Sequence, residues 1–140
     1  MNATAAASFE DFIAALPKVE LHVHLEGSMQ PATLLALADK HQIGDLQRSL
    51  AEIRSWYEFR DFPHFLEVYR HAVRVLRGED DFALLAAETI RTLAQQNVRY
   101  AEVNFSLCDH LERDISAEVV FAGLEQGRKQ LEAEHDITIR

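Results

Sequence analysis

The sequence predicts an α/β protein with a parallel sheet, because three strand-like segments are separated by helical ones. Residues 19–25, 98–107 and 137–140 carry the alternating or apolar patterns of strands. Strands separated by helices pair in parallel through right-handed crossovers. The second crossover has the length of a simple strand–helix–strand unit, and the first, from residue 26 to 97, is more than twice as long. We therefore expect a helical insert after the first strand.

The helices follow from their end signals. Ser8 and Ser116 are placed to cap helices, and Pro31 is placed at the first position of another. Acidic residues at 80 and 81 suit the start of a long helix, since they favour the positive end of its dipole. We expect helical segments, in chain order, over 9–16, 31–41, 46–78, 81–97 and 117–135.

The last strand pattern continues to the end of the sequence, with no closing helix after it. Three parallel strands cannot close a barrel, and they leave unprotected edges. We therefore expect the chain to be the N-terminal part of a longer protein.

Composition bounds the partners and the compartment. Lys plus Arg is 14 against 23 for Asp plus Glu, and the resulting net charge of -9 argues against nucleic acid or an anionic membrane as partner. Cys108 is the only cysteine, so no intrachain disulfide or thiolate zinc cage is expected. The first residues lack a secretory signal pattern, and no run of about 18 apolar residues is present. We expect a cytoplasmic location. The five scattered glycines form neither a G-x-G-x-x-G nor a Walker A motif.

The most informative stretch is LPKVELHVHLEGS, residues 16–28, where ionisable side chains interrupt an apolar strand. Side chains on a strand alternate faces, so one face is expected to carry Glu20, His22, His24 and Glu26. Imidazoles two residues apart lie close enough to hold one metal ion, and zinc binds neutral imidazole readily. The spacing alone also fits a strand whose polar face meets water. A strand covered on both faces favours the metal site, because unpaired charges are costly there.

These residues resemble a known family. LPKVELHVHLEGSMQPATLLALA, residues 16–38, is similar to the opening signature of adenosine and adenine deaminases, which are zinc-dependent (β/α)₈-barrel enzymes. VRYAEVNFS, residues 98–106, resembles their second strand, although Asn104 and Leu107 stand where Arg and Pro are often found. The resemblance implies the N-terminal portion of a TIM barrel with a helical insert between strands 1 and 2. Residues 1–140 would then be the N-terminal part of a single barrel domain.

The resemblance also implies roles for individual residues. His22 and His24 would be zinc ligands, and Glu26 would hydrogen-bond the substrate. In such enzymes zinc activates water for attack on C6 of a 6-aminopurine, and ammonia leaves. Many adenosine-specific relatives carry Asp where Glu26 stands, so adenosine and adenine both stay open as the small-molecule substrate. The family's other zinc ligands and its proton-donating glutamate motif are not found in the sequence. We therefore expect no catalytic residue in this chain and no activity from it alone.

Two alternatives remain open: another metal-dependent amidohydrolase, and an inactive fragment or helical binding module. The zinc deaminases with H-x-E and P-C-x-x-C signatures are excluded by the single cysteine. His64 and His71 are interpreted as solvated helix positions. His110 follows the second strand and is either loop polarity or a group that acts near the site. The aromatic residues over 56–69 either pack the insert onto the sheet or form a wall over the purine.

Overall fold

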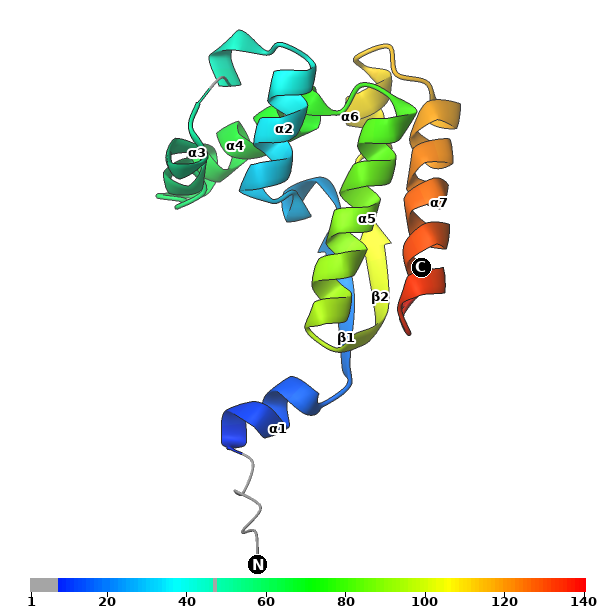
Figure 1. The fold of residues 1–140 in the computed structure, drawn as a ribbon. Helices are drawn as coiled ribbons and strands as arrows, with labels where there is room; N and C mark the ends of the chain where they lie inside the picture. Colours follow the sequence, from blue (N-terminus) through cyan, green and yellow to red (C-terminus); the bar gives the residue numbers. More distant parts are fainter. Residues whose placement is uncertain (1–7, 47) are drawn as a thin grey trace, which may run out of the picture.

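The computed structural model describes residues 8–46 and 48–140, and it confirms an α/β fold built on a parallel sheet (Figure 1). The sheet contains strands β1 (Lys18–His24), β2 (Val98–Asn104) and β3 (Thr138–Ile139), which lie side by side in that order. Both pairs of neighbours are parallel, as the helical crossovers require.

The register between β1 and β2 is interrupted within β1. Glu20 and Val23 are three residues apart, yet their partners on β2 are only two residues apart. The extra residue makes a β-bulge, which bends a strand and redirects its side chains. His22 lies inside the bulge with a φ of 63°. The strands are level again at their ends, where His24 pairs with Asn104.

Helices α5 (Glu79–Gln95) and α7 (Ala117–Glu134) are the two crossovers, and Figure 1 shows them side by side along the sheet. Their backbones touch at two glycines of α7. A Cβ at Gly123 would lie 2.3 Å from a carbonyl oxygen of α5, and one at Gly127 would lie 2.5 Å from another. Only residues without a side chain allow this approach, so these two glycines set the distance between the helices.

The insert expected after the first strand is present, and in Figure 1 its helices gather beyond the carboxyl end of β1. The segment predicted as helical over 46–78 divides into separate elements, because Ser49 and Asp61 each cap a new helix. The insert contains η1 (Glu26–Ser28), α2 (Pro31–Lys40), η2 (Gly44–Leu46), α3 (Leu50–Trp56) and α4 (Phe62–Val75).

A buried carboxylate joins the insert to the crossover helices. Asp81 in the first turn of α5 has no exposed surface. It accepts hydrogen bonds from Lys40 Nζ at 2.7 Å and from His41 Nε2 at 2.8 Å, both at the end of α2. It also accepts from the backbone N–H groups of Arg77 and Gly78. One side chain thus caps α5 and holds α2 against it.

A second polar contact holds the end of α4. Helix α6 (Leu107–Leu111) follows β2 and is succeeded by Arg113. The guanidinium of Arg113 donates to three carbonyl oxygens at the end of α4, those of Val73, Arg74 and Leu76. Carbonyls at a helix end lack the usual amide partners, so Arg113 supplies donors there, although the Val73 carbonyl also accepts from the N–H of Leu76. The strand predicted over 98–107 is three residues too long, since β2 ends at Asn104 and α6 begins at Leu107.

Helix α1 (Phe9–Ala15) has the predicted cap, a capping box between Ser8 and Asp11. It contains no buried residue, and Figure 1 shows it beyond the opposite end of β1 from the insert. The apolar core lies elsewhere, in one cluster around the insert and α5 and another between the sheet and the crossover helices. Among the described residues, no helix combines the length and the apolar character that a membrane span requires.

Candidate functional site

His22 and His24 bring their imidazoles together at the end of β1. Their Nε2 atoms are 3.1 Å apart, and the rings meet edge to face with centroids 4.9 Å apart. Two nitrogens that each lie 2.0–2.1 Å from a tetrahedral zinc are about 3.3 Å from one another. The pair therefore fits one zinc ion as two of its ligands. Within residues 8–46 and 48–140, no group of three or more His, Cys, Asp or Glu side chains is placed to hold a metal.

The backbone at His22 corrects the predicted alternation. The bulge puts His22 at a φ of 63°, so the strand does not simply alternate from Glu20 to Glu26. Glu20 is exposed, whereas Glu26, expected on the same face, is 1% exposed. A left-handed conformation costs a non-glycine residue roughly 1–2 kcal/mol. Such strain is typical of residues whose position serves a site.

Glu26 is directed into the protein in η1. Its Oε1 accepts hydrogen bonds from the backbone N–H of Ser106 at 2.9 Å and from Nε2 of His110 at 3.0 Å. Its Oε2 and the Nδ1 of His110 are buried without a hydrogen-bond partner. The carboxylate thus joins the end of β1 to the segment after β2. Direct contact between Glu26 and a substrate stays a prediction.

Tyr69 of α4 reaches the same segment. Its hydroxyl and the Ser106 hydroxyl are 2.9 Å apart. Burial and the nearby charges of Glu26 and Asp109 raise the pKa of Tyr69, against the opposing effect of the Ser106 hydrogen bond. The phenol is therefore protonated at neutral pH, and it remains a hydrogen-bond donor.

A pocket of about 480 Å³ opens beside His24. One wall is aromatic and comes from α4, and the polar groups come from η1 and the segment after β2. Among the described residues that line it, none is Asp, Glu, Lys or Arg. The lining residues are His24, Gly27, Ser28, Phe62, Phe65, Leu66, Tyr69 and Ser106.

The aromatic residues of the insert divide between the two interpretations of that segment. Trp56 and Tyr57 pack against the apolar core. Phe62, Phe65 and Tyr69 line the pocket beside His24 instead. The insert is therefore both a packing element and a pocket wall.

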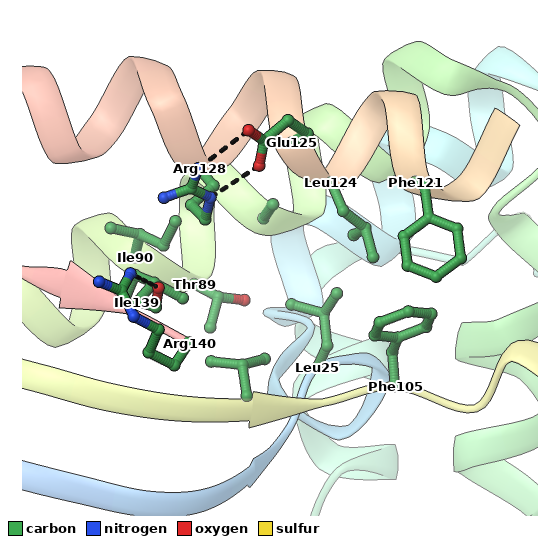
Figure 2. A pocket seen from close by; sticks show the side chains of 12 residues that line it. Leu25, Thr89, Ile90, Phe105, Phe121, Leu124, Glu125, Arg128, Ile139 and Arg140 are labelled. Carbon is green, nitrogen blue, oxygen red and sulfur yellow. Dashed lines mark hydrogen bonds and ion pairs between the residues drawn. The ribbon is translucent and has the colours of Figure 1, made fainter. Parts of the chain in front are cut away.

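A second cavity, of about 160 Å³, lies between the sheet and the helices α5 and α7 (Figure 2). Its lining is mostly apolar, with Leu25 and Phe105 on one side and the ion-paired Glu125 and Arg128 at its edge. Neither imidazole of the His22–His24 pair contributes to it. We therefore assign the functional site to the pocket beside His24.

The remaining histidines differ in how well the sequence predicted them. His64 is 7% exposed, and its Nδ1 accepts a hydrogen bond from the backbone N–H of Arg60, so the solvated position predicted for it is wrong. His110 is fully buried against Glu26, which excludes simple loop polarity. Its position directly after a strand, at the same end as the His pair, was the available signal. Tyr69 and Ser106 gave no sequence signal, since 37 residues separate them.

A parallel α/β sheet with a helical insert after strand one and paired imidazoles at that strand's end defines the N-terminal portion of a TIM-barrel amidohydrolase. The family model described as adenosine deaminase matches residues 17–140. The chain belongs to this family and corresponds to the N-terminal part of its members.

Individual relatives agree with the family. The chain is 42% identical to an adenine deaminase of Rhodospirillum rubrum, over 88% of its own length and 37% of the relative's. It is 35% identical to an aminodeoxyfutalosine deaminase of Streptomyces avermitilis, over 99% of its own length and 39% of the relative's. The chain thus spans less than half the length of these relatives.

Solved structures show the same partial coverage. A crystal structure of adenine deaminase from Arthrobacter aurescens matches with a TM-score of 0.82 and 30% identity, over 89% of this chain and 38% of that one. An amidohydrolase from Burkholderia ambifaria, whose crystal structure contains bound zinc, matches with a TM-score of 0.79 and 31% identity. The match covers 100% of this chain and 38% of that amidohydrolase chain.

Proposed function

We propose that this chain is the N-terminal part of a zinc-dependent enzyme that removes the amino group of a 6-aminopurine, adenine or adenosine, by hydrolysis. One observation carries the proposal. The Nε2 atoms of His22 and His24 converge to 3.1 Å, beside a pocket whose wall is aromatic. Two relatives named as deaminases match 88% and 99% of the chain, which supports the proposal.

The imidazoles have a direct chemical role in this proposal. Zinc, when bound, supplies an activated water for attack on the ring carbon that carries the amino group. His22 and His24 would hold the ion through Nε2, and both must be neutral to do so. The bulge at His22 sets the direction in which its side chain leaves the strand. We propose that the remaining ligands and the proton-donating group come from other parts of the full-length protein.

The pocket would hold the purine. Phe62, Phe65 and Tyr69 offer flat apolar surfaces that pack against an aromatic heterocycle and exclude water from it. Among the described residues that line it none is Lys or Arg, so this part of the pocket offers no cationic side chain to a phosphate. Glu26 would reach the substrate directly only if its buried carboxylate turned toward the pocket.

We further propose that residues 1–140 fold as part of one barrel domain and that the protein is cytoplasmic. The continuous match over residues 17–140 supports the single domain. The acidic composition and single cysteine favour a reducing compartment without a nucleic-acid or membrane partner.

The test is ammonia release by the zinc-loaded full-length protein, with adenine and adenosine as separate substrates. We expect turnover of at least one of them, and no turnover by the 140-residue chain alone. If the protein hydrolyses non-purine amides and does not deaminate adenine or adenosine, the result would favour another amidohydrolase activity. Turnover by the isolated chain would contradict the assignment of catalytic groups to the rest of the protein.

A further inference from the structure

The pocket beside His24 contains a pair of hydroxyls with an unused hydrogen-bond donor. Ser28 also lines the pocket, but its hydroxyl donates to the backbone carbonyl of His24 at 2.9 Å. The hydroxyls of Tyr69 and Ser106 bond to one another at 2.9 Å, and within residues 8–46 and 48–140 neither hydroxyl has another hydrogen-bond partner. Each hydroxyl has one proton, and their mutual bond uses one of the two. One O–H therefore remains, whichever of the two hydroxyls donates in the pair.

A 6-aminopurine offers a specific match for that donor. Its amino group is a poor acceptor, and its acceptors are the ring nitrogens. A donor in an otherwise apolar wall selects for an acceptor, because a ligand without one would leave the O–H unpaired.

The Tyr69–Ser106 hydroxyl pair is also positioned by hydrogen bonds that the backbone of Ser106 joins. The backbone N–H of Ser106 donates to Glu26 Oε1, and the same oxygen accepts from His110. Glu26 and His110 are each at most 1% exposed, so this support is shielded from water. Buried hydrogen bonds of this kind fix the position of the groups they join more firmly than solvated ones do.

We propose that the Tyr69–Ser106 hydroxyl pair donates a hydrogen bond to N1, N3 or N7 of the purine, and that the buried Glu26–His110 pair positions the hydroxyl pair. The inference rests on the proposed function for the identity of the ligand. It adds a specificity-determining contact from α4 and from the segment after β2, and it assigns His110 a positioning role.

The experiment measures ligand affinity by calorimetry on the zinc-loaded full-length protein. The ligands are purine and its 1-deaza, 3-deaza and 7-deaza analogues, none of which carries an amino group that deamination would remove. The main variant is the double substitution Tyr69→Phe with Ser106→Ala, because either hydroxyl alone still supplies a donor. Ser28→Ala is the matched control, since the proton of that hydroxyl is already used within the protein.

We expect the double variant to bind purine about tenfold more weakly than wild type, the typical effect of a lost hydrogen bond in a pocket. On the one deaza analogue that lacks the contacted nitrogen, wild type and double variant should bind equally. Ser28→Ala should change all four affinities by the same factor. An equal loss on all four ligands in the double variant, or no loss on purine, would overturn the contact.

The positioning role has its own readout. His110→Ala should reproduce the ligand pattern of the double variant, and His110→Gln, which keeps an N–H donor, should restore the wild-type pattern. Equal affinities for His110→Ala and wild type would overturn the role of His110. If His110→Ala does not fold, His110→Phe, which fills the same space without an N–H donor, takes its place with the same two outcomes.

The outcomes separate this inference from the proposed function. Ring-nitrogen-dependent binding without ammonia release from adenine or adenosine would support the contact and refute the deaminase. Ammonia release with an unchanged affinity pattern in the double variant would do the reverse. Failure of wild type to bind purine would overturn both.

Discussion

The contact between α5 and α7 and the end of β1 are built in opposite ways. At Gly123 and Gly127 the two helices touch through their backbones, and no atom can be added. At the end of β1, His22 and His24 have exposed side chains on a bulged backbone. The first region is held by close packing, whereas the second places polar groups at the cost of local strain. Substitutions in the crossover helices should therefore change stability without changing metal binding, and substitutions at the histidines should mainly change metal binding.

The largest expected effect in the crossover helices comes from Asp81→Ala. This change leaves Lys40 and His41 without their buried partner and removes the cap of α5. The lost cap and the lost hydrogen bonds to charged groups together cost about 2–4 kcal/mol of unfolding free energy, because Lys40 remains half exposed to water. Urea unfolding of the chain should show this loss, and the control Asp80→Ala, which removes a neighbouring exposed carboxylate, should stay within about 1 kcal/mol of wild type. A loss for Asp81→Ala no larger than the control's would contradict the role of the contact.

The next largest effect tests the backbone contact itself. Gly123→Ala and Gly127→Ala should each lower the unfolding free energy by about 1–3 kcal/mol, because the new methyl group meets backbone atoms that cannot move aside. Gly44→Ala is the control, since no atom lies within 4 Å of a Cβ there. Wild-type stability in both α7 variants, measured by the same unfolding titration, would mean that the helices are not this close.

The pH dependence of stability sharpens the same point. Burial raises the pKa of Asp81, but hydrogen bonds from Lys40, Arg77, Gly78 and His41 outweigh burial and leave the pKa lowered. A pKa lower in the folded than in the unfolded chain gives stability that is complete above the unfolded value of about 3.9. This stability is lost as the pH falls through the folded value. Asp81→Asn should be less stable than wild type at pH 7, with a difference that narrows below about pH 4. A difference that does not change with pH would contradict the ionised state of Asp81.

The smallest effect on stability is expected at the end of β1, where His22 lies. The unfolding free energy of His22→Gly should be about 1 kcal/mol higher than that of His22→Ala, because glycine adopts the left-handed backbone without strain. Both variants should lose the same zinc affinity, as both lack the imidazole. Equal stability of the two would show that the bulge at His22 stores no strain.

The sequence predicted the elements with local signals and missed the contacts that need the fold. Ser8 and Ser116 cap helices as expected, and the strand–helix order gave the parallel sheet. The His-x-His spacing indicated the metal pair. It could not indicate the bulge, because the register of β1 is set by its partners on β2, which lie 80 or 81 residues further along the chain.

The buried pair behind the site shows the same limit. Glu26 and His110 are 84 residues apart in sequence, and each looked like a polar residue near a strand end. Only the fold shows that they meet with both side chains buried. His64 was misjudged for a related reason, since its hydrogen bond to the backbone of Arg60 depends on the turn before α4.

Zinc content is the most direct test of the central claim, that the end of β1 is a metal-binding strand. The full-length protein should contain about one zinc per chain, and His22→Ala or His24→Ala should lose most of it. His71→Ala, which removes an imidazole of α4 outside the pocket, should retain wild-type zinc. Unchanged zinc content in both His22→Ala and His24→Ala would contradict the account.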